Sequence, residues 1–79
     1  MRISYVGNRS FKTRLAEFSY RDGEEEKFME ICRQLEELGY KVDTGVANWA
    51  CIEVEDRQEY EQVARDYLKI KRTLNTRGD

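Results

Sequence analysis

Two stretches of the chain alternate apolar and polar residues with the two-residue period of a half-buried β-strand. The first covers residues 14–20 and has two faces, one with Ala16, Phe18 and Tyr20 and the other with Leu15, Glu17 and Ser19. A short apolar run, residues 3–6, precedes it, and the polar residues 7–10 are typical of a turn. Residues 1–22 are therefore predicted to form a β-hairpin.

The second alternating stretch, residues 40–55, predicts another hairpin. One face comprises Tyr40, Val42, Thr44, Ala50, Ile52 and Val54, and the opposite face comprises Lys41, Asp43, Cys51, Glu53 and Glu55. The turn lies within residues 45–48, where Gly45 and Asn48 are both suitable turn residues. The pattern therefore leaves the register of this hairpin open.

Two other stretches repeat apolar residues every three or four positions, which is typical of amphipathic helices. In residues 23–38 the apolar stripe consists of Phe28, Ile31, Cys32, Leu35 and Leu38. Asp22 is predicted to be the N-cap, and Glu25, three positions later, has the spacing of a capping box. Gly39 is expected to end this helix with a positive φ, which glycine adopts without a Cβ penalty.

The second helix is predicted over residues 57 to about 72. Its apolar stripe consists of Tyr60, Val63, Ala64, Tyr67 and Leu68, with Ile70 and Leu74 extending it. Asp56 is the expected N-cap, and Glu59 repeats the capping-box spacing. Residues 73–79 are expected to fray into a disordered tail.

The resulting order, ββαββα, predicts an α+β fold in which a four-stranded antiparallel sheet carries both helices on one face. A chain of 79 residues has room for one hydrophobic core, so residues 1–72 are expected to form a single domain. Ferredoxin-like packing, with the first strand as an addition, is the main variant of this architecture.

The composition excludes several chemistries. Without a histidine, the chain lacks the commonest general base near neutral pH and the commonest metal ligand. Cys32 and Cys51 form no CxxC pair, so we expect neither a metal site nor a cofactor. The carboxylates of runs such as 24–26 and 36–37 diverge by about 100° per residue around a helix and do not converge on one substrate atom. The sequence therefore predicts a protein that is not an enzyme.

Cysteine usage and hydropathy bear on the compartment. Two cysteines in a chain of this length do not resemble the disulfide framework of a small secreted domain, which favours free thiols in a reducing cytoplasm. No apolar run approaches the roughly 18 residues needed to span a bilayer, so no membrane partner is expected.

Charge is unevenly distributed, although the whole chain carries only −2. Residues 1–22 hold five basic and two acidic groups, a net of +3, whereas residues 23–38 hold two basic and six acidic groups, a net of −4. Polarised fields of this kind steer partners and suppress wrong ones. The distribution favours a binding role.

These features predict a small binding module that acts through contacts with another protein. Trp49 and Phe11 lie near the predicted hairpin turns, where an exposed ring would be a good interface anchor, although Trp49 is equally consistent with a ring folded over the sheet. Glu24, Glu25 and Glu26 add an acidic surface that could imitate a nucleic-acid backbone. By analogy of size and charge, the most concrete form is a phage or mobile-element inhibitor of a nucleic-acid enzyme, comparable to anti-CRISPR proteins.

Two alternatives stay open. The first hairpin interleaves basic and aromatic side chains, as do modules that stack single-stranded bases. The residues that would bind nucleic acid there are Arg9, Lys12, Arg14, Tyr5 and Tyr20. The acidic isoelectric point, about 5.2, argues against this alternative. The other alternative is a structural or oligomerisation domain, for example a homodimer.

Overall fold

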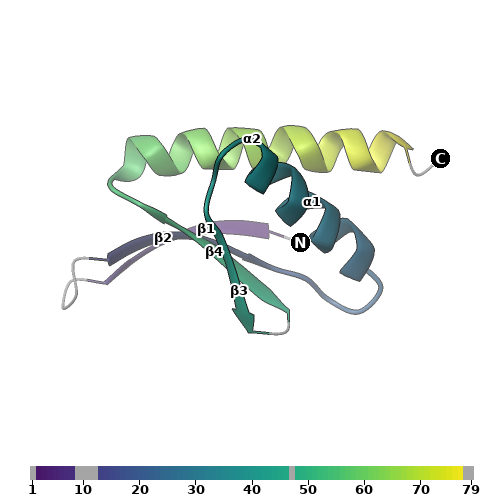
Figure 1. Cartoon of the computed structure of the whole chain (residues 1–79), viewed down its shortest axis with the longest axis horizontal. Helices are drawn as coiled ribbons and strands as arrows, with labels where there is room; N and C mark the ends of the chain where they lie inside the picture. The colour runs from purple at the N-terminus through teal and green to yellow at the C-terminus, as the bar shows by residue number, and fades with distance from the viewer. Residues whose placement is uncertain (1, 9–12, 47, 78–79) are drawn as a thin grey trace.

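The computed structural model describes residues 2–8, 13–46 and 48–77 of the 79-residue chain. Its elements are β1 (Arg2–Asn8), β2 (Thr13–Ser19), α1 (Glu25–Glu37), β3 (Val42–Val46), β4 (Trp49–Val54) and α2 (Arg57–Arg77) (Figure 1). This β-β-α-β-β-α order confirms the predicted α+β fold.

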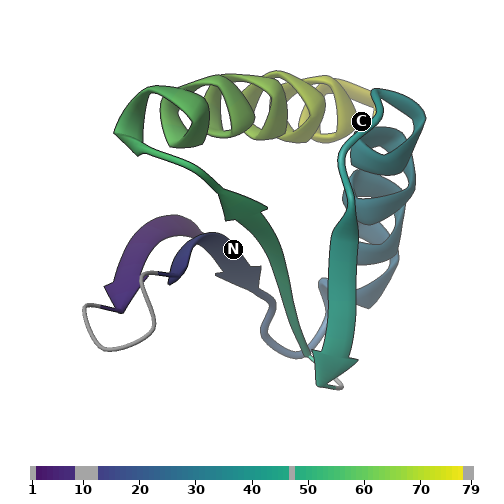
Figure 2. The ribbon, with the colours of Figure 1, turned by 60° about the vertical axis from the view of Figure 1, so that its left-hand side comes forward.

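The four strands form one antiparallel sheet in the order β1-β2-β4-β3. The two hairpins meet through β2 and β4, whose ladder runs from Arg14↔Val54 to Ser19↔Trp49. Strands β2 and β3 are parallel and flank β4, so β2, α1 and β3 make the split β-α-β unit of the ferredoxin-like variant. Both helices cover the same face of the sheet, as Figure 2 shows, with α2 against β1, β2 and β4 and α1 against β3.

The core lies between this face and the helices. Alternate residues of β2 and β4 supply its floor, and the most deeply buried are Ala16, Phe18, Ala50, Ile52 and Val54. The Phe18 ring lies between the two helices, with centroid distances of 5.5 Å to Phe28 and 5.0 Å to Tyr67. The period-two pattern thus assigned the strand faces correctly. Two stripe residues differ, because Leu38 and Leu68 are 60% and 49% exposed.

The beginning of α1 differs from the prediction. The helix starts at Glu25 with Glu24 as its N-cap, because Gly23 has a φ of 92° and interrupts helical geometry before that point. The carboxylate of Glu24 accepts a hydrogen bond from the Arg21 backbone N–H, and that of Glu25 accepts one from the Gly23 N–H, both at 3.1 Å. The predicted N-cap role of Asp22 was therefore wrong.

The end of α1 confirms the role of Gly39, whose φ is 101°. The Tyr40 N–H donates to the Leu35 carbonyl at 3.1 Å, and the Gly39 N–H donates to the Glu36 carbonyl at 2.9 Å. These two bonds are those of a Schellman motif, which satisfies carbonyl groups that the helix leaves unpaired. The motif turns the chain from α1 towards β3.

The beginning of α2 confirms the second cap. Asp56 Oδ1 accepts a hydrogen bond from the Glu59 backbone N–H at 2.8 Å. Glu59 Oε2 accepts in turn from the backbone N–H of Glu55, at 3.2 Å, one residue before the position that a capping box uses. The cap therefore fixes the junction between β4 and α2.

The end of α2 lies beyond the predicted one. The helix continues to Arg77, so the expected tail was wrong for residues 73–77, while residues 78–79 lie outside the described part of the chain. Leu74 packs against the core, and Lys27 of α1 donates to Asn75 Oδ1 at 3.0 Å. Both contacts hold the last turns of α2 against the rest of the domain.

The turn of the second hairpin falls between Val46 and Trp49, which pair with each other. Residue 47 of this turn is outside the described residues, and the Asn48 carbonyl accepts from the Tyr20 N–H at 3.1 Å. The β3–β4 register shifts between Asp43 and Val46. Alternation alone could not reveal this irregularity, because it depends on the pairing of the two strands.

Candidate functional site

The candidate site is the face of the sheet that carries no helix, here named the open face. It is formed by Ser4, Val6, Leu15, Glu17, Trp49, Cys51, Glu53 and Asp43. The strand register brings these side chains together, because Leu15 lies opposite both Val6 and Glu53, and Cys51 lies opposite both Glu17 and Asp43. The open face therefore combines apolar groups with carboxylates.

Trp49 is the largest side chain of the open face. It is half-buried, and its indole Nε1–H donates to Glu17 Oε2 at 3.1 Å. This bond crosses diagonally from β4 to β2, and it fixes the ring over the sheet while leaving part of it accessible. Phe11, the other predicted anchor, lies outside the described residues.

Cys51 lies in the middle of the open face, yet its side chain is only 7% exposed. Burial raises the pKa of its thiol, and the carboxylates of Asp43, Glu17 and Glu53 raise it further. Burial also raises the pKa of Cys32, on the core side, to about 11. Both thiols are therefore protonated at neutral pH and are weak nucleophiles.

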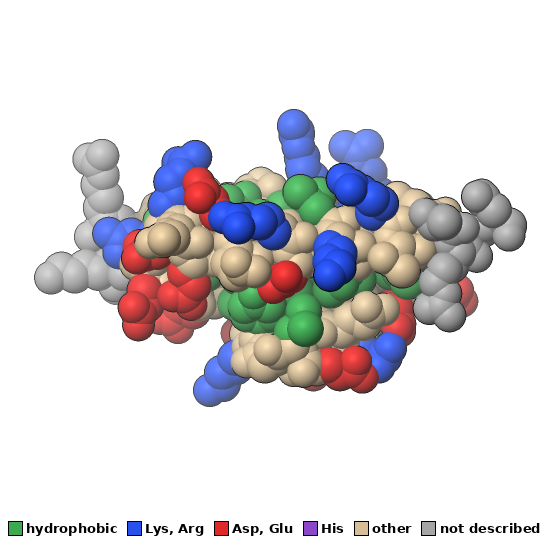
Figure 3. All heavy atoms as spheres, turned by 90° about the horizontal axis from the view of Figure 1, so that it is seen from above, with side chains coloured by type: hydrophobic (Ala, Val, Ile, Leu, Met, Phe, Trp, Pro, Cys, Tyr) green, Lys and Arg blue, Asp and Glu red, His purple; other side chains and the backbone are tan. Residues whose placement is uncertain are grey.

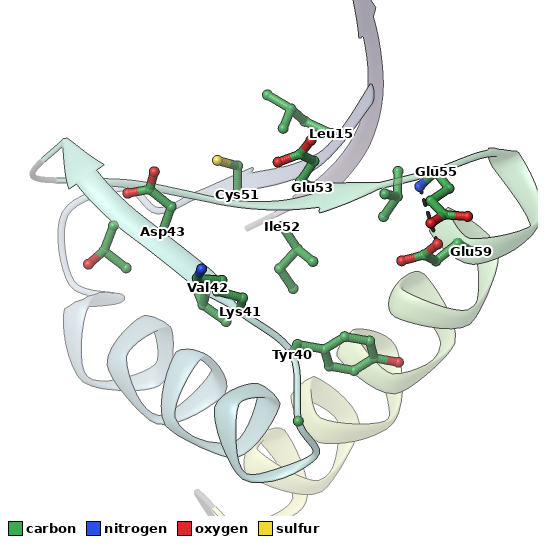
Figure 4. Close-up of a pocket in the computed structure, with 13 residues that line it drawn as sticks. Leu15, Tyr40, Lys41, Val42, Asp43, Cys51, Ile52, Glu53, Glu55 and Glu59 are labelled. Atoms are coloured by element: carbon green, nitrogen blue, oxygen red, sulfur yellow. Dashed lines mark hydrogen bonds between the residues drawn. The ribbon is translucent and has the colours of Figure 1, made fainter. Parts of the chain in front are cut away.

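An open hollow of about 1170 Å³ adjoins the open face where β3 and the 39–41 segment diverge from the end of β4. Figure 4 shows Leu15, Cys51 and Glu53 on one side of β4 and Tyr40, Val42 and Ile52 on the other. Four carboxylates line the hollow, those of Asp43, Glu53, Glu55 and Glu59, together with a single basic group, that of Lys41. This end of the open face is therefore acidic.

Tyr40 closes the helix side of this hollow. Its hydroxyl donates to Asp66 Oδ2 on α2. Burial, followed by this hydrogen bond, raises the pKa of Tyr40 to about 12. The phenol therefore stays protonated across the physiological range and serves as a link between the 39–41 segment and α2.

The acidic run Glu24–Glu26 is placed at the start of α1. Two of its carboxylates bind backbone N–H groups of the preceding loop, as described above. The hydrogen bond from the Arg21 N–H is the main reason why the pKa of Glu24 is lowered. Glu24 and Glu25 thus have a local role in starting α1, while Glu26 is exposed.

Tyr5 and Tyr20, two of the residues proposed for nucleic-acid binding, do not lie on the open face. Tyr5 stacks on Tyr60 of α2 with ring centroids 4.9 Å apart, and Tyr20 packs on Phe28 of α1 at 4.6 Å. Arg14 donates to the Glu55 carbonyl at 3.0 Å. Arg9 and Lys12 lie outside the described residues. Both tyrosines are thus held against helices.

Sequence reasoning missed the partners of Trp49. The alternation placed Leu15 and Glu17 on one face of β2, and it placed Cys51 opposite the apolar face of β4. What it lacked was the pairing of β2 with β4, which joins residues more than 30 positions apart, such as Glu17 and Trp49. Long-range pairing of this kind leaves no local pattern.

Comparisons of the chain with models of protein families, with curated proteins and with solved structures found no match. Neither helix in the described part of the chain has the length and apolar character that crossing a membrane requires. Among the same residues, no three cysteine, aspartate or glutamate side chains form a group that could hold a metal ion.

Proposed function

We propose that this protein is a non-enzymatic binding module that docks another protein on the open face of its sheet. The observation that carries the proposal is Trp49, a large ring that is partly accessible and held in place by Glu17 on a face that no described element covers. Trp is enriched among residues that dominate binding energy, and a ring already fixed in position loses little entropy on docking.

The surroundings of Trp49 indicate what kind of surface it meets. Val6 and Leu15 are half-buried apolar neighbours on the same face, and the carboxylates of Glu17, Asp43 and Glu53 surround Cys51. An apolar centre beside carboxylates matches a partner surface that is basic around an apolar pocket. We therefore propose a basic partner protein.

The most concrete form of this proposal is an inhibitor of a nucleic-acid enzyme. Such enzymes present basic surfaces to nucleic acid, and an acidic face with a fixed aromatic anchor could occupy one of them. A phage or mobile element is the proposed source, because small inhibitors of nucleic-acid enzymes from such sources act in this way. The open face replaces the Glu24–Glu26 run as the proposed contact surface, since Glu24 and Glu25 hold the start of α1.

Affinity capture with paired variants tests the proposed surface. The first variant combines Leu15→Lys with Trp49→Ala on the open face. The second combines Met29→Lys with Leu38→Ala, which changes charge equally and alters two exposed apolar residues on or next to helix α1. We expect the wild type and the helix variant to capture the same protein, and the open-face variant to lose it.

The captured protein is then purified and titrated against the wild type. Trp49 is the only tryptophan of the chain, so its emission reports on the proposed surface directly when the partner's binding region is prepared without tryptophan. A shift in its emission with saturable binding supports the proposal. Equal capture by the open-face variant, or binding without any change at Trp49, would show that the contact lies elsewhere.

A further inference from the structure

We infer that the outer side of α2 is a second binding surface, one that contacts the phosphate backbone of nucleic acid without reading its sequence. This surface, here named the α2 ridge, consists of Arg65, Leu68, Lys69 and Arg72, all of which are exposed. The inference does not rest on the proposed function, because the ridge lies on the opposite side of the molecule from the open face.

The position of the ridge follows from helix geometry. Val63, Tyr67 and Ile70 of α2 are at most 7% exposed and face the core. Residues about half a turn away point outwards, and Arg65, Lys69 and Arg72 share one stripe at i, i+4 and i+7. In Figure 3, which views the molecule from above α2, Lys and Arg side chains gather along this helix.

The charge of α2 contrasts with that of the rest of the chain. Residues 57–77 hold six basic and three acidic groups, a net of +3, so the remainder of a chain of net −2 carries −5. Two acidic groups of the same helix have partners outside the ridge: Glu61 Oε1 lies 3.6 Å from Arg57 Nε, and Asp66 accepts a hydrogen bond from the Tyr40 hydroxyl. A basic stripe along one helix is the usual electrostatic footprint of nucleic-acid binding.

Helix stability does not account for the whole stripe. Cations near a C-terminus offset the helix dipole, but that effect falls off within the last turn. Arg65 and Lys69 lie 12 and 8 positions before Arg77, the last residue of α2, which is more than two turns away. Compensation of the helix dipole therefore does not explain why Arg65 and Lys69 lie on the same side as Arg72, whereas contact with a phosphate backbone would use all three.

The spacing and chemistry of the ridge favour a phosphate backbone over other anions. At 1.5 Å per residue, the three cations cover about 10 Å of helix axis, a length over which one strand of a duplex presents about three to four phosphates. The ridge carries no aromatic anchor of the kind that protein partners use. Leu68 alone gives it too little apolar area to enter a lipid surface.

Fluorescence anisotropy with labelled mixed-sequence oligonucleotides tests the inference. Duplex DNA, single-stranded DNA and single-stranded RNA are titrated with the full chain at about 50 and 200 mM salt. For duplex DNA, three phosphate contacts predict that affinity falls about 40-fold between these concentrations. The variant Arg65→Gln/Lys69→Gln/Arg72→Gln should abolish binding, and Lys69→Gln alone should reduce the salt dependence by about one contact.

A charge-matched control separates the ridge from net charge. The variant Arg2→Gln/Arg21→Gln/Lys41→Gln also removes three exposed cations, but none of them belongs to α2. We expect it to keep most of the wild-type affinity and its salt dependence. Circular dichroism melting first establishes that both triple variants remain folded; the glutamines of the ridge variant stand at exposed helix positions, where glutamine is well tolerated.

Three results would overturn the inference. One is a wild-type chain that binds none of the oligonucleotides at the lower salt concentration. Another is an equal loss of affinity in the two triple variants, which would show that binding depends on the net charge of the protein and not on the α2 ridge. The third is binding to phosphatidylglycerol–phosphatidylcholine vesicles in the absence of oligonucleotide binding, which would make the ridge a lipid contact.

Discussion

The two faces of the sheet are built from alternate residues of the same strands, yet their side chains differ in burial and in chemical surroundings. On the helix side, Phe18 and Ile52 are 2% and 3% exposed and touch other apolar groups. On the open face, their chain neighbours Glu17 and Cys51 lie among carboxylates, with Trp49 tied to Glu17. The helix side holds the hydrophobic core, and the open face is left without a covering element among the described residues, as the proposed function requires.

The largest effect that would sharpen this comparison is expected at Phe18. Phe18→Ala removes a ring packed between both helices and should lower the free energy of unfolding by about 3–5 kcal/mol, a large part of the stability of so small a domain. Leu15→Ala, on the other face of the same strand, should cost about 1 kcal/mol, because Leu15 is only half-buried. Urea unfolding measures both values. Similar losses would show that the open face also contributes core stability.

A smaller effect is expected at Trp49. Trp49→Ala removes the hydrogen bond to Glu17 and part of the buried ring area, and should lower the free energy of unfolding by about 1–2 kcal/mol. Trp49→Phe keeps much of the area and isolates the contribution of the bond. Thermal melting of both variants gives the comparison. A loss as large as that of Phe18→Ala would contradict an accessible Trp49.

On the helix side of the sheet, a substitution of Tyr67 is expected to keep or raise the stability of the domain, in contrast to Phe18→Ala. Its side chain is fully buried, and its hydroxyl has no hydrogen-bond partner among the described residues. Tyr67→Phe should therefore leave stability unchanged or raise it by up to about 1 kcal/mol. A loss of several kcal/mol in urea unfolding would reveal a partner for the hydroxyl.

The same tyrosine predicts a dependence on alkaline pH. Burial raises the pKa of Tyr67 from 10.0 to about 12, so above pH 10 the unfolded chain ionises first. The associated stability is present below that pH and is lost as pH rises towards 12. Tyr67→Phe should therefore flatten the fall in stability between these values. An unchanged slope in unfolding curves would place the alkaline sensitivity elsewhere.

The smallest expected effect is a difference between the modification rates of the two thiols, which reports on the local surroundings of each cysteine. Both are expected to react slowly with iodoacetamide near neutral pH, because their pKa values are raised. Cys51 is covered only by side chains of the open face, whereas Cys32 belongs to α1 and faces the hydrophobic core, so Cys51 should be modified first. Mass spectrometry of each cysteine peptide follows the two rates. If both cysteines were modified at the same rate, and only as fast as the whole domain unfolds, Cys51 would be no more accessible than the core. That result would contradict an accessible open face.

Local pattern was enough to predict much of the fold. Alternation assigned Ala16 and Phe18 to the buried face, and Asp56 and Gly39 marked helix ends, because each of these signals depends on residues a few positions apart. The start of α1 was missed, since Gly23 takes a positive φ that outweighs the capping-box spacing of Asp22. Nothing local could reveal the bond between Trp49 and Glu17, or that the α2 ridge and the open face lie on opposite sides of the molecule. Both depend on how distant elements pack.

The register shift in β3 gives the sheet two unequal edges. β1 pairs with β2 without a break from Arg2↔Ser19 to Asn8↔Thr13, so its outer backbone groups form a regular row. A regular edge strand is a template for another strand, whereas an irregular one discourages such pairing. Two copies that met at β1 would form one continuous sheet with β3 at both ends, where the irregular strand would disfavour the addition of further chains.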